Sequence, residues 1–160
     1  MSLEIFQDPA EEDIADPTLR ALWLYWQSLS RRKSSLPSRR DIDPADMQSM
    51  LPWTFLIDPK GEGGYRYRLV GTRIVKDMGY DMTGQLVARA YAGPDWPEVK
   101  KDYDFVVARG QACMTYNSVV LVPSNVHYTY ARLLLPLASD GETVDMLLGG
   151  AVQSAPRQRA

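Results

Sequence analysis

The residue types that most often carry chemistry are sparse in this sequence of 160 residues. It contains one histidine, His127, and one cysteine, Cys113. A single histidine excludes metal sites built from several histidine ligands. It also leaves His127 as the sole imidazole base for a serine triad, and no G-x-S-x-G motif accompanies it. Since His127 follows the turn-forming residues "PSN", we expect a surface side chain at a strand end rather than a ligand or a base.

Cys113 lies in "GQACMTYN", at the start of a predicted strand, and we expect a buried structural thiol there. A lone cysteine cannot form an internal disulfide, which fits a reducing compartment.

Carboxylates occur in pairs that could serve acid–base catalysis if they converged in a pocket. Each pair falls in a predicted turn or on a polar helix face, which predicts solvated side chains; the pairs are Asp77 with Asp81, Asp102 with Asp104, and Asp140 with Glu142. Asp145 differs because it interrupts the apolar run "TVDMLLGG". Strand alternation places it opposite Val144 and Met146, so we expect it to be exposed or hydrogen-bonded.

Aromatic residues are the richest feature with chemical potential. A phenol combines apolar area with a hydrogen-bonding tip, which suits a pocket for a flat or amphipathic molecule, although core packing would use the same residues. Those expected around the predicted sheet and its helices are Tyr65, Tyr67, Tyr80, Tyr91, Trp96, Tyr103, Tyr116, Tyr128 and Tyr130.

The elements that must position these side chains begin with helices. Residues 1–16 are acidic and poor in large apolar groups, which predicts a flexible arm. Asp16 and Pro17 are typical of a helix start. The apolar face of that helix repeats at three- and four-residue spacing through Leu19, Leu22, Trp23, Trp26 and Leu29. After the polar linker "SRRKSSLPSRR", Asp43 and Pro44 predict a second helix that Pro52 closes.

Strands and inserted helices make up the rest of the predicted domain. The strand ranges are 53–58, 65–70, 112–121, 127–137 and 143–151, with short links typical of antiparallel neighbours. A short helix over Thr72–Met78 and a longer one from Pro94 to Ala108 come between the second and third strands, and Gly110 ends the longer helix. This order predicts one α+β domain over residues 17–152, with a tail at 153–160.

Charge and hydropathy exclude two classes of partner. The net charge of −2 and the absence of a concentrated basic face argue against nucleic acid. No apolar run approaches the roughly 20 residues that span a bilayer, and the N-terminus lacks the basic-then-apolar order of a secretory signal. We therefore expect a cytoplasmic protein with no nucleic-acid or membrane partner.

The segment "TFLIDPKGEGGYRYRLVGTRIVKDMGYDMTGQ" resembles the opening of a PAS domain, with Asp58, Gly79, Tyr80 and Gly84 at the positions of that family's Asp, Gly-Tyr pair and later Gly. Together with "LRALWLYWQSL" and "LLLPLASDGETVDMLLGG", it is similar to a stand-alone, largely alphaproteobacterial PAS family formerly filed as a domain of unknown function. The resemblance covers residues 17–152. It implies a PAS-like five-stranded antiparallel sheet, with the inserted helices on one face and the N-terminal helix covering the other. It also implies that the first strand lies at the centre, beside the last.

The resemblance further implies a ligand cavity between the sheet and the inserted helices. Strand alternation and the long-helix stripe predict that it is bounded by Tyr67, Leu69, Met78, Tyr80, Tyr103 and Val107. Haem-binding PAS domains present a histidine from the long helix, and flavin-binding light sensors carry an asparagine-cysteine-arginine motif before it. This chain has neither feature, so the sequence leaves the cofactor unknown and predicts no metal site.

Three functions follow from these features. We favour a non-catalytic sensory or regulatory module for signal transduction that binds a small ligand, a protein partner or both. The alternative is an interaction module that forms an obligate dimer and fills its pocket with side chains. A small enzyme using a Tyr/Asp pair is the third. In each case we expect a homodimer through the N-terminal helix, at Leu22, Trp23, Tyr25 and Trp26, which also cap the sheet.

Overall fold

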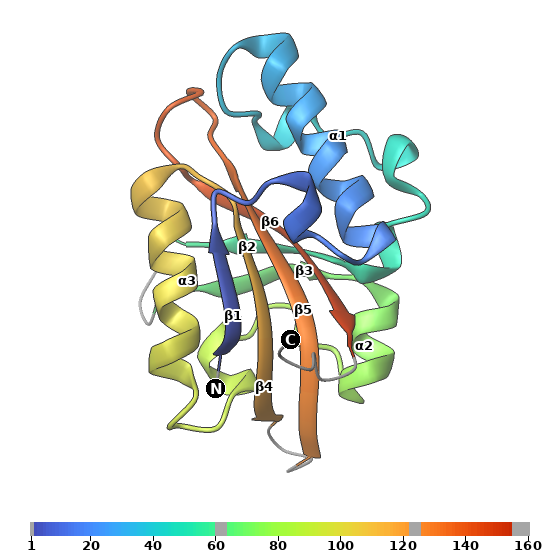
Figure 1. The fold of residues 1–160 in the computed structure, drawn as a ribbon, viewed down its shortest axis with the longest axis vertical. Helices are drawn as coiled ribbons and strands as arrows, with labels where there is room; N and C mark the ends of the chain where they lie inside the picture. The colour runs from blue at the N-terminus through green and yellow to red at the C-terminus, as the bar shows by residue number, and fades with distance from the viewer. Residues whose placement is uncertain (1, 60–63, 122–125, 155–160) are drawn as a thin grey trace.

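The computed structural model describes residues 2–59, 64–121 and 126–154, which form one six-stranded sheet with helices on both faces (Figure 1). The strand order is β1-β4-β5-β6-β2-β3, and each neighbouring pair is antiparallel. The strands are β1 (Ser2–Gln7), β2 (Thr54–Asp58), β3 (Arg66–Val70), β4 (Cys113–Leu121), β5 (Val126–Leu137) and β6 (Met146–Gln153). The predicted α+β antiparallel architecture is therefore confirmed.

The five predicted strands correspond to β2 through β6, with ends that differ by three residues or fewer. β2 pairs with β6, as the resemblance implies, but it lies second from the sheet edge rather than at the centre. The predicted helices at 72–78 and near 94–108 are α2 (Thr72–Met78) and α3 (Trp96–Arg109). The links predicted between the first two strands, at "PKGEGG", and between the third and fourth, at "PSN", lie largely outside the described residues. So does most of the predicted tail at 153–160.

The second predicted helix is wrong in type. Instead of one α-helix, the segment forms two short 3₁₀ turns, Pro44–Met47 and Leu51–Trp53. Asp43 still caps the first turn, because its side chain accepts a hydrogen bond from the Ala45 amide at 2.9 Å. Pro52 interrupts the amide ladder that a longer helix would need.

The N-terminal arm is not loose, contrary to the composition-based expectation. Residues 2–7 form β1, which extends the sheet by pairing with the outer edge of β4. The Tyr116 hydroxyl on β4 donates to the Asp13 carbonyl at 3.0 Å and accepts from the Ala15 amide at 3.2 Å, while Ile14 is fully buried. Backbone pairing to a free strand edge depends on the partner strand, so the composition of the arm alone does not reveal it.

Helix α1 (Pro17–Lys33) covers one face of the sheet, as predicted (Figure 1). Asp16 caps it by accepting hydrogen bonds from the Thr18 and Leu19 amides at 2.9 and 3.0 Å. Its buried stripe packs on alternate residues of β4, β5 and β6, and consists of Leu19, Leu22, Trp26 and Leu29. The Trp26 indole also donates to the Pro136 carbonyl at 2.9 Å, which ties the helix to β5.

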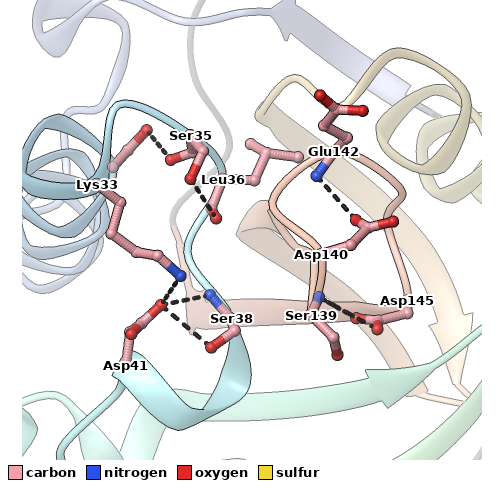
Figure 2. Close-up of polar contacts among 10 residues, drawn as sticks. Lys33, Ser35, Leu36, Ser38, Asp41, Ser139, Asp140, Glu142 and Asp145 are labelled. Atoms are coloured by element: carbon pink, nitrogen blue, oxygen red, sulfur yellow. Dashed lines mark hydrogen bonds and ion pairs between the residues drawn. The ribbon is translucent and has the colours of Figure 1, made fainter.

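The polar linker after α1 is held against the turn between β5 and β6 (Figure 2). Lys33 and the backbone amide of Ser38 both bind Asp41, at 2.7 and 2.8 Å. Those bonds lie within the linker, and two backbone bonds then join it to the turn. The Ala138 amide donates to the Pro37 carbonyl at 2.8 Å, and the Leu36 amide donates to the Gly141 carbonyl at 3.1 Å. In the same turn, Asp145 accepts hydrogen bonds from the Ser139 amide, in line with the expectation of an exposed or hydrogen-bonded side chain, although it precedes β6 rather than lying in the strand.

Helices α2 and α3 pack on the opposite face, where the side chains of β2, β5 and β6 form a second buried cluster. Within this layer the Phe55 ring on β2 lies over Gly149 on β6, its direct partner across the two strands. A methyl group at Gly149 would overlap the Phe55 ring. Glycine at this position thus lets an aromatic ring lie flat against the sheet beneath the helices.

Substitution of Gly149 tests this packing. We expect Gly149→Ala to lower the free energy of unfolding by about 1–3 kcal/mol, because the added methyl forces Phe55 to move in a filled core. Gly93→Ala is the matched control, since a Cβ there meets no atom within 4 Å. Urea unfolding of both variants measures the difference. Equal stability of the two variants would contradict the placement of the Phe55 ring.

Candidate functional site

A cavity of about 50 Å³ lies between the sheet and the helical layer formed by α2, α3 and the 3₁₀ turn Val87–Ala90. Four of its lining side chains are half-buried: Met78, Tyr91, Tyr128 and Ala151. The cavity therefore reaches the surface near the end of α2, the start of β5 and the end of β6. The lining residues are Phe55, Tyr67, Ile74, Met78, Met82, Ala90, Tyr91, Tyr103, Tyr128, Tyr130, Arg132 and Ala151. Aromatic side chains dominate this wall, and Arg132 is its one charged member.

Arg132 and Asp102 form a buried ion pair behind the cavity. The Arg132 Nη2 atom lies 2.5 Å from Asp102 Oδ2, and the two side chains are only 2% and 4% exposed. Thr115 on β4 donates its hydroxyl to the same carboxylate oxygen at 3.2 Å. The pair therefore joins α3, which carries Asp102, to β4 and β5. Burial raises the pKa of Asp102, against the opposing effects of Arg132 and Thr115.

Local sequence explains how both charges reach the interior. Tyr130, Arg132 and Leu134 alternate along β5. The arginine therefore lies on the same face as Tyr130 and Leu134, which belong to the buried cluster beneath α2 and α3. Asp102 comes three residues after Val99 and four before Val106 on α3, within the buried stripe of that helix. Each charged residue thus occupies a position that the periodicity of its element directs inward.

Tyrosine hydroxyls surround the guanidinium. Tyr130 Oη accepts a hydrogen bond from Asn117 Nδ2 at 3.0 Å and another from Arg132 Nη1 at 3.3 Å. The hydroxyl of Tyr91 lies 3.2 Å from that of Tyr130. The Arg132 guanidinium carbon also lies 5.1 Å from the centroid of the Tyr103 ring, within the range of a cation–π contact.

Three phenols near the guanidinium, those of Tyr67, Tyr103 and Tyr130, have raised pKa values because they are buried. Burial raises the pKa of Tyr67 well above its usual value, the neighbouring Tyr91, Tyr103 and Tyr130 raise it further, and Arg132 lowers it. Burial likewise raises the pKa of Tyr130 and of Tyr103. These hydroxyls therefore stay protonated at physiological pH and remain available as donors.

Three buried polar atoms in this region have no hydrogen-bond partner among the residues that the structure describes: Tyr103 Oη, Asn117 Oδ1 and Arg132 Nε. Buried polar atoms are paired in the great majority of cases, because leaving one unpaired costs about 1–3 kcal/mol. Tyr103 and Arg132 line the small cavity, and Asn117 bonds the lining residue Tyr130, which makes this group the strongest sign of a binding site in the described part of the chain.

The predicted pocket residues fall into three groups. Tyr67, Met78 and Tyr103 line the cavity. Tyr80 and Val107 are half-buried and pack against the same cluster, but they do not line it. Leu69 is misplaced in the prediction, because it lies on the other face of the sheet and is 45% exposed.

A β-bulge causes the error at Leu69. Ile57 pairs with Tyr67, whereas the preceding Leu56 pairs with Leu69, so that Arg68 is an extra residue on β3. The extra residue reverses the alternation, which directs Tyr67 toward the cavity and Leu69 away from it. A simple count along "YRYRLV" gives no sign of the bulge.

The buried polar residues were the main omission of the sequence-based prediction. Asp102 was expected to be solvated as part of a carboxylate pair, and this is wrong because α3 directs it into the core. Asp104, its partner in the predicted pair, is exposed. Two signals in the sequence could have identified the ion pair. Asp102 lies between Val99 and Val106 on the apolar stripe of the helix, and Arg132 lies in the apolar strand "YARLLLPL".

His127 and Cys113 lie where the sequence placed them. His127 is exposed near the start of β5, and Cys113 is buried. Burial raises the pKa of the Cys113 thiol to about 11, so that it stays protonated. A Tyr–Asp pair does occur, since Tyr65 donates to Asp104 at 2.6 Å, but neither residue lines the cavity.

Comparisons with known proteins identify the class of this fold. The sequence matches the PAS domain family over residues 14–152, which is most of the chain. The protein therefore belongs to the PAS domain family, a family of sensory and signalling modules. No curated protein matches the sequence.

Solved structures agree on the fold at low sequence identity. An RNA-binding light-oxygen-voltage receptor superposes with a TM-score of 0.58 at 13% identity, over 94% of this chain and 38% of the receptor. The Rhodobacter sphaeroides LOV protein gives 0.55 at 12% identity, over 70% and 68% of the two chains. The PAS-B domain of Drosophila melanogaster Cycle with bound glycerol gives 0.52 at 8%, over 64% and 99%. At these identities the similarity extends to the fold alone.

Among the described residues, no helix combines the length and apolar character that a membrane span requires.

The buried ion pair makes a stability prediction. We expect Asp102→Asn to lower the free energy of unfolding by about 3–5 kcal/mol, because it leaves the Arg132 charge buried without a counter-ion. The double variant Asp102→Leu with Arg132→Met removes both charges, and we expect it to recover most of that loss. Urea unfolding of the single and double variants measures both effects. A single variant as stable as the parent would contradict a buried pair.

Proposed function

We propose that this PAS domain is a non-catalytic sensory module that binds a small molecule in the cavity between the sheet, α2 and α3. The observation that carries the proposal is the buried polar group behind a tyrosine-lined cavity: the Arg132–Asp102 ion pair, with Arg132 Nε, Tyr103 Oη and Asn117 Oδ1 unpaired among the described residues. A core built for packing alone gains little from such groups, because each buried ion costs several kcal/mol in lost hydration.

The size of the cavity limits the ligand. A cavity of about 150 Å³ accommodates benzene, whereas one water needs roughly 10–15 Å³. The cavity here, at about 50 Å³, suits a molecule of a few non-hydrogen atoms rather than the flat ring suggested by the tyrosine content. A larger ligand would have to displace half-buried side chains at the mouth, such as Met78 and Tyr128.

The ion pair offers a route from ligand to output. Arg132 lines the cavity, and its Nη2 atom holds α3 through Asp102. A ligand that binds the guanidinium therefore acts on the bond that fixes α3 to the sheet. The module would signal by changing the relative stability of two positions of α3, and thereby a contact with a protein partner.

Native mass spectrometry of protein purified from its own host tests the ligand proposal. We expect the folded chain to carry an added mass of a small molecule, which is lost when the protein is denatured. Tyr103→Phe, which changes the cavity wall, should reduce the fraction that carries this mass, whereas Tyr65→Phe outside the cavity should not. A bare chain mass under native conditions, for the parent protein and both variants, would contradict the proposal.

Assembly through α1 is a second proposal, with fewer residues than the sequence suggested. Leu22 and Trp26 are buried against the chain's own sheet, so they serve as its cover rather than as an interface. Trp23 and Tyr25 are half-buried, and Leu24 is 45% exposed on the same helix. Trp23 and Tyr25 pack against the chain's own core, so the proposed contact centres on Leu24, and symmetric pairing there gives a homodimer, the commonest closed assembly.

Sedimentation velocity at tens of micromolar tests the homodimer. We expect the parent chain to sediment as a dimer and Leu24→Glu to sediment as a monomer, because the added charge would lie in the interface. Leu69→Glu is the matched control: Leu69 is also 45% exposed, but it lies on β3. A monomeric parent, or equal effects of the two variants, would contradict an interface on α1.

A further inference from the structure

The hydrogen-bond donors around the cavity that the protein itself leaves unused indicate which class of ligand the cavity can bind. Arginine and the amide nitrogen of asparagine only donate hydrogen bonds. Tyr130 Oη accepts from both Asn117 Nδ2 and Arg132 Nη1, so its two acceptor positions are filled. Because these two bonds fill its acceptor positions, we assign Tyr130 as the donor in its 3.2 Å contact with the Tyr91 hydroxyl. Tyr91 consequently accepts from Tyr130 and keeps its own proton free for another acceptor.

Arg132 also retains donors that the protein does not use. Its contact with Asp102 involves Nη2 alone, although a guanidinium can bind a carboxylate through two nitrogens. The Nε–H group has no partner among the described residues. The Nη1 group bonds Tyr130 at 3.3 Å and reaches Tyr91 only at the long distance of 3.5 Å. Part of the hydrogen-bonding capacity of the guanidinium therefore remains open.

Tyr103 adds a third free donor. Its side chain is fully buried, it lines the cavity, and its hydroxyl has no partner within the described ranges. Arg132, Tyr91 and Tyr103 thus present unused N–H and O–H groups from β5, the end of the 3₁₀ turn Val87–Ala90, and α3. Asp102 pairs with Arg132 from behind, and the described residues that line the cavity include no carboxylate, so the wall presents guanidinium and hydroxyl donors.

From this donor set and the cavity volume we infer that the site binds a small carboxylate, a molecule of a few carbon atoms whose two oxygens accept from Arg132, Tyr91 and Tyr103. The inference rests on the proposed function and specifies its ligand class. Hydrogen bonds from a guanidinium to a carboxylate are roughly twice as strong as those between neutral groups. A neutral amide of the same shape brings an NH₂ group that would face these same donors.

Calorimetric titration with matched pairs of small molecules tests this ligand class. The probes are formate, acetate and propionate against acetamide and 1-propanol, at equal ionic strength set with sodium chloride. We expect at least one of the three carboxylates to bind with a dissociation constant at least tenfold lower than that of acetamide. Ligand-observed NMR on the same samples detects weak binding that calorimetry misses.

Two tyrosine variants separate recognition from folding. We expect Tyr103→Phe to weaken carboxylate binding about tenfold, with no loss of unfolding free energy, because it removes a buried hydroxyl that has no partner among the described residues. Tyr65→Phe is the matched control, since it deletes a hydroxyl in the same aromatic cluster that donates to Asp104 outside the cavity. It should leave binding unchanged.

The outcomes distinguish this inference from the proposed function. Equal binding of acetate and acetamide, or equal losses in the two tyrosine variants, would overturn the carboxylate assignment. So would failure of all three carboxylates to bind while native mass spectrometry still detects a bound small molecule, and in that case the sensory function would stand. No binding by any probe, together with a bare chain mass, would overturn both.

Discussion

The ion pair between Arg132 and Asp102 is the interaction on which the rest of the helical layer depends. A charge pair that is almost completely buried is stable only when its geometry and its additional hydrogen bonds offset the loss of hydration. Here Thr115 donates to Asp102 and Tyr130 accepts from Arg132, while Asn117 in turn donates to Tyr130, and all three residues belong to β4 and β5. The pair therefore fixes α3 to the centre of the sheet and determines where the cavity can form.

The two faces of the sheet differ in the polarity of the side chains that they bury. Alternate residues of β5 face opposite layers, so that Leu133 and Leu135 pack beneath α1 while Tyr130 and Arg132 face α3. The α1 layer is apolar and well covered, with Trp26 fixed to the Pro136 carbonyl. The α3 layer contains the buried charges, the unpartnered polar atoms and the cavity. Apolar burial on the first face thus supports a second face that carries costly polar groups.

The sequence predicts most of the architecture because local periodicity and turn chemistry determine it. The helix Thr72–Met78, the cap at Asp16 and the antiparallel order of β4, β5 and β6 were all predicted from such patterns. Two features depend on contacts between distant segments and were not predicted. β1 needs the free edge of β4, and the bulge at Arg68 moves Leu69 to the other face of the sheet. The Arg132–Asp102 contact spans 30 residues, so neither partner reveals the other in a local pattern.

The most direct test of the central claim, that Arg132 is the binding centre of a small-molecule cavity, is the NMR resonance of its Nε–H group. In the free protein this group is buried and without an acceptor among the described residues. The account predicts that saturating acetate shifts the Arg132 Nε–H proton resonance downfield and slows its exchange with water, because a carboxylate oxygen then accepts from the guanidinium. An Nε–H resonance that stays unchanged while acetate perturbs signals elsewhere would contradict the account.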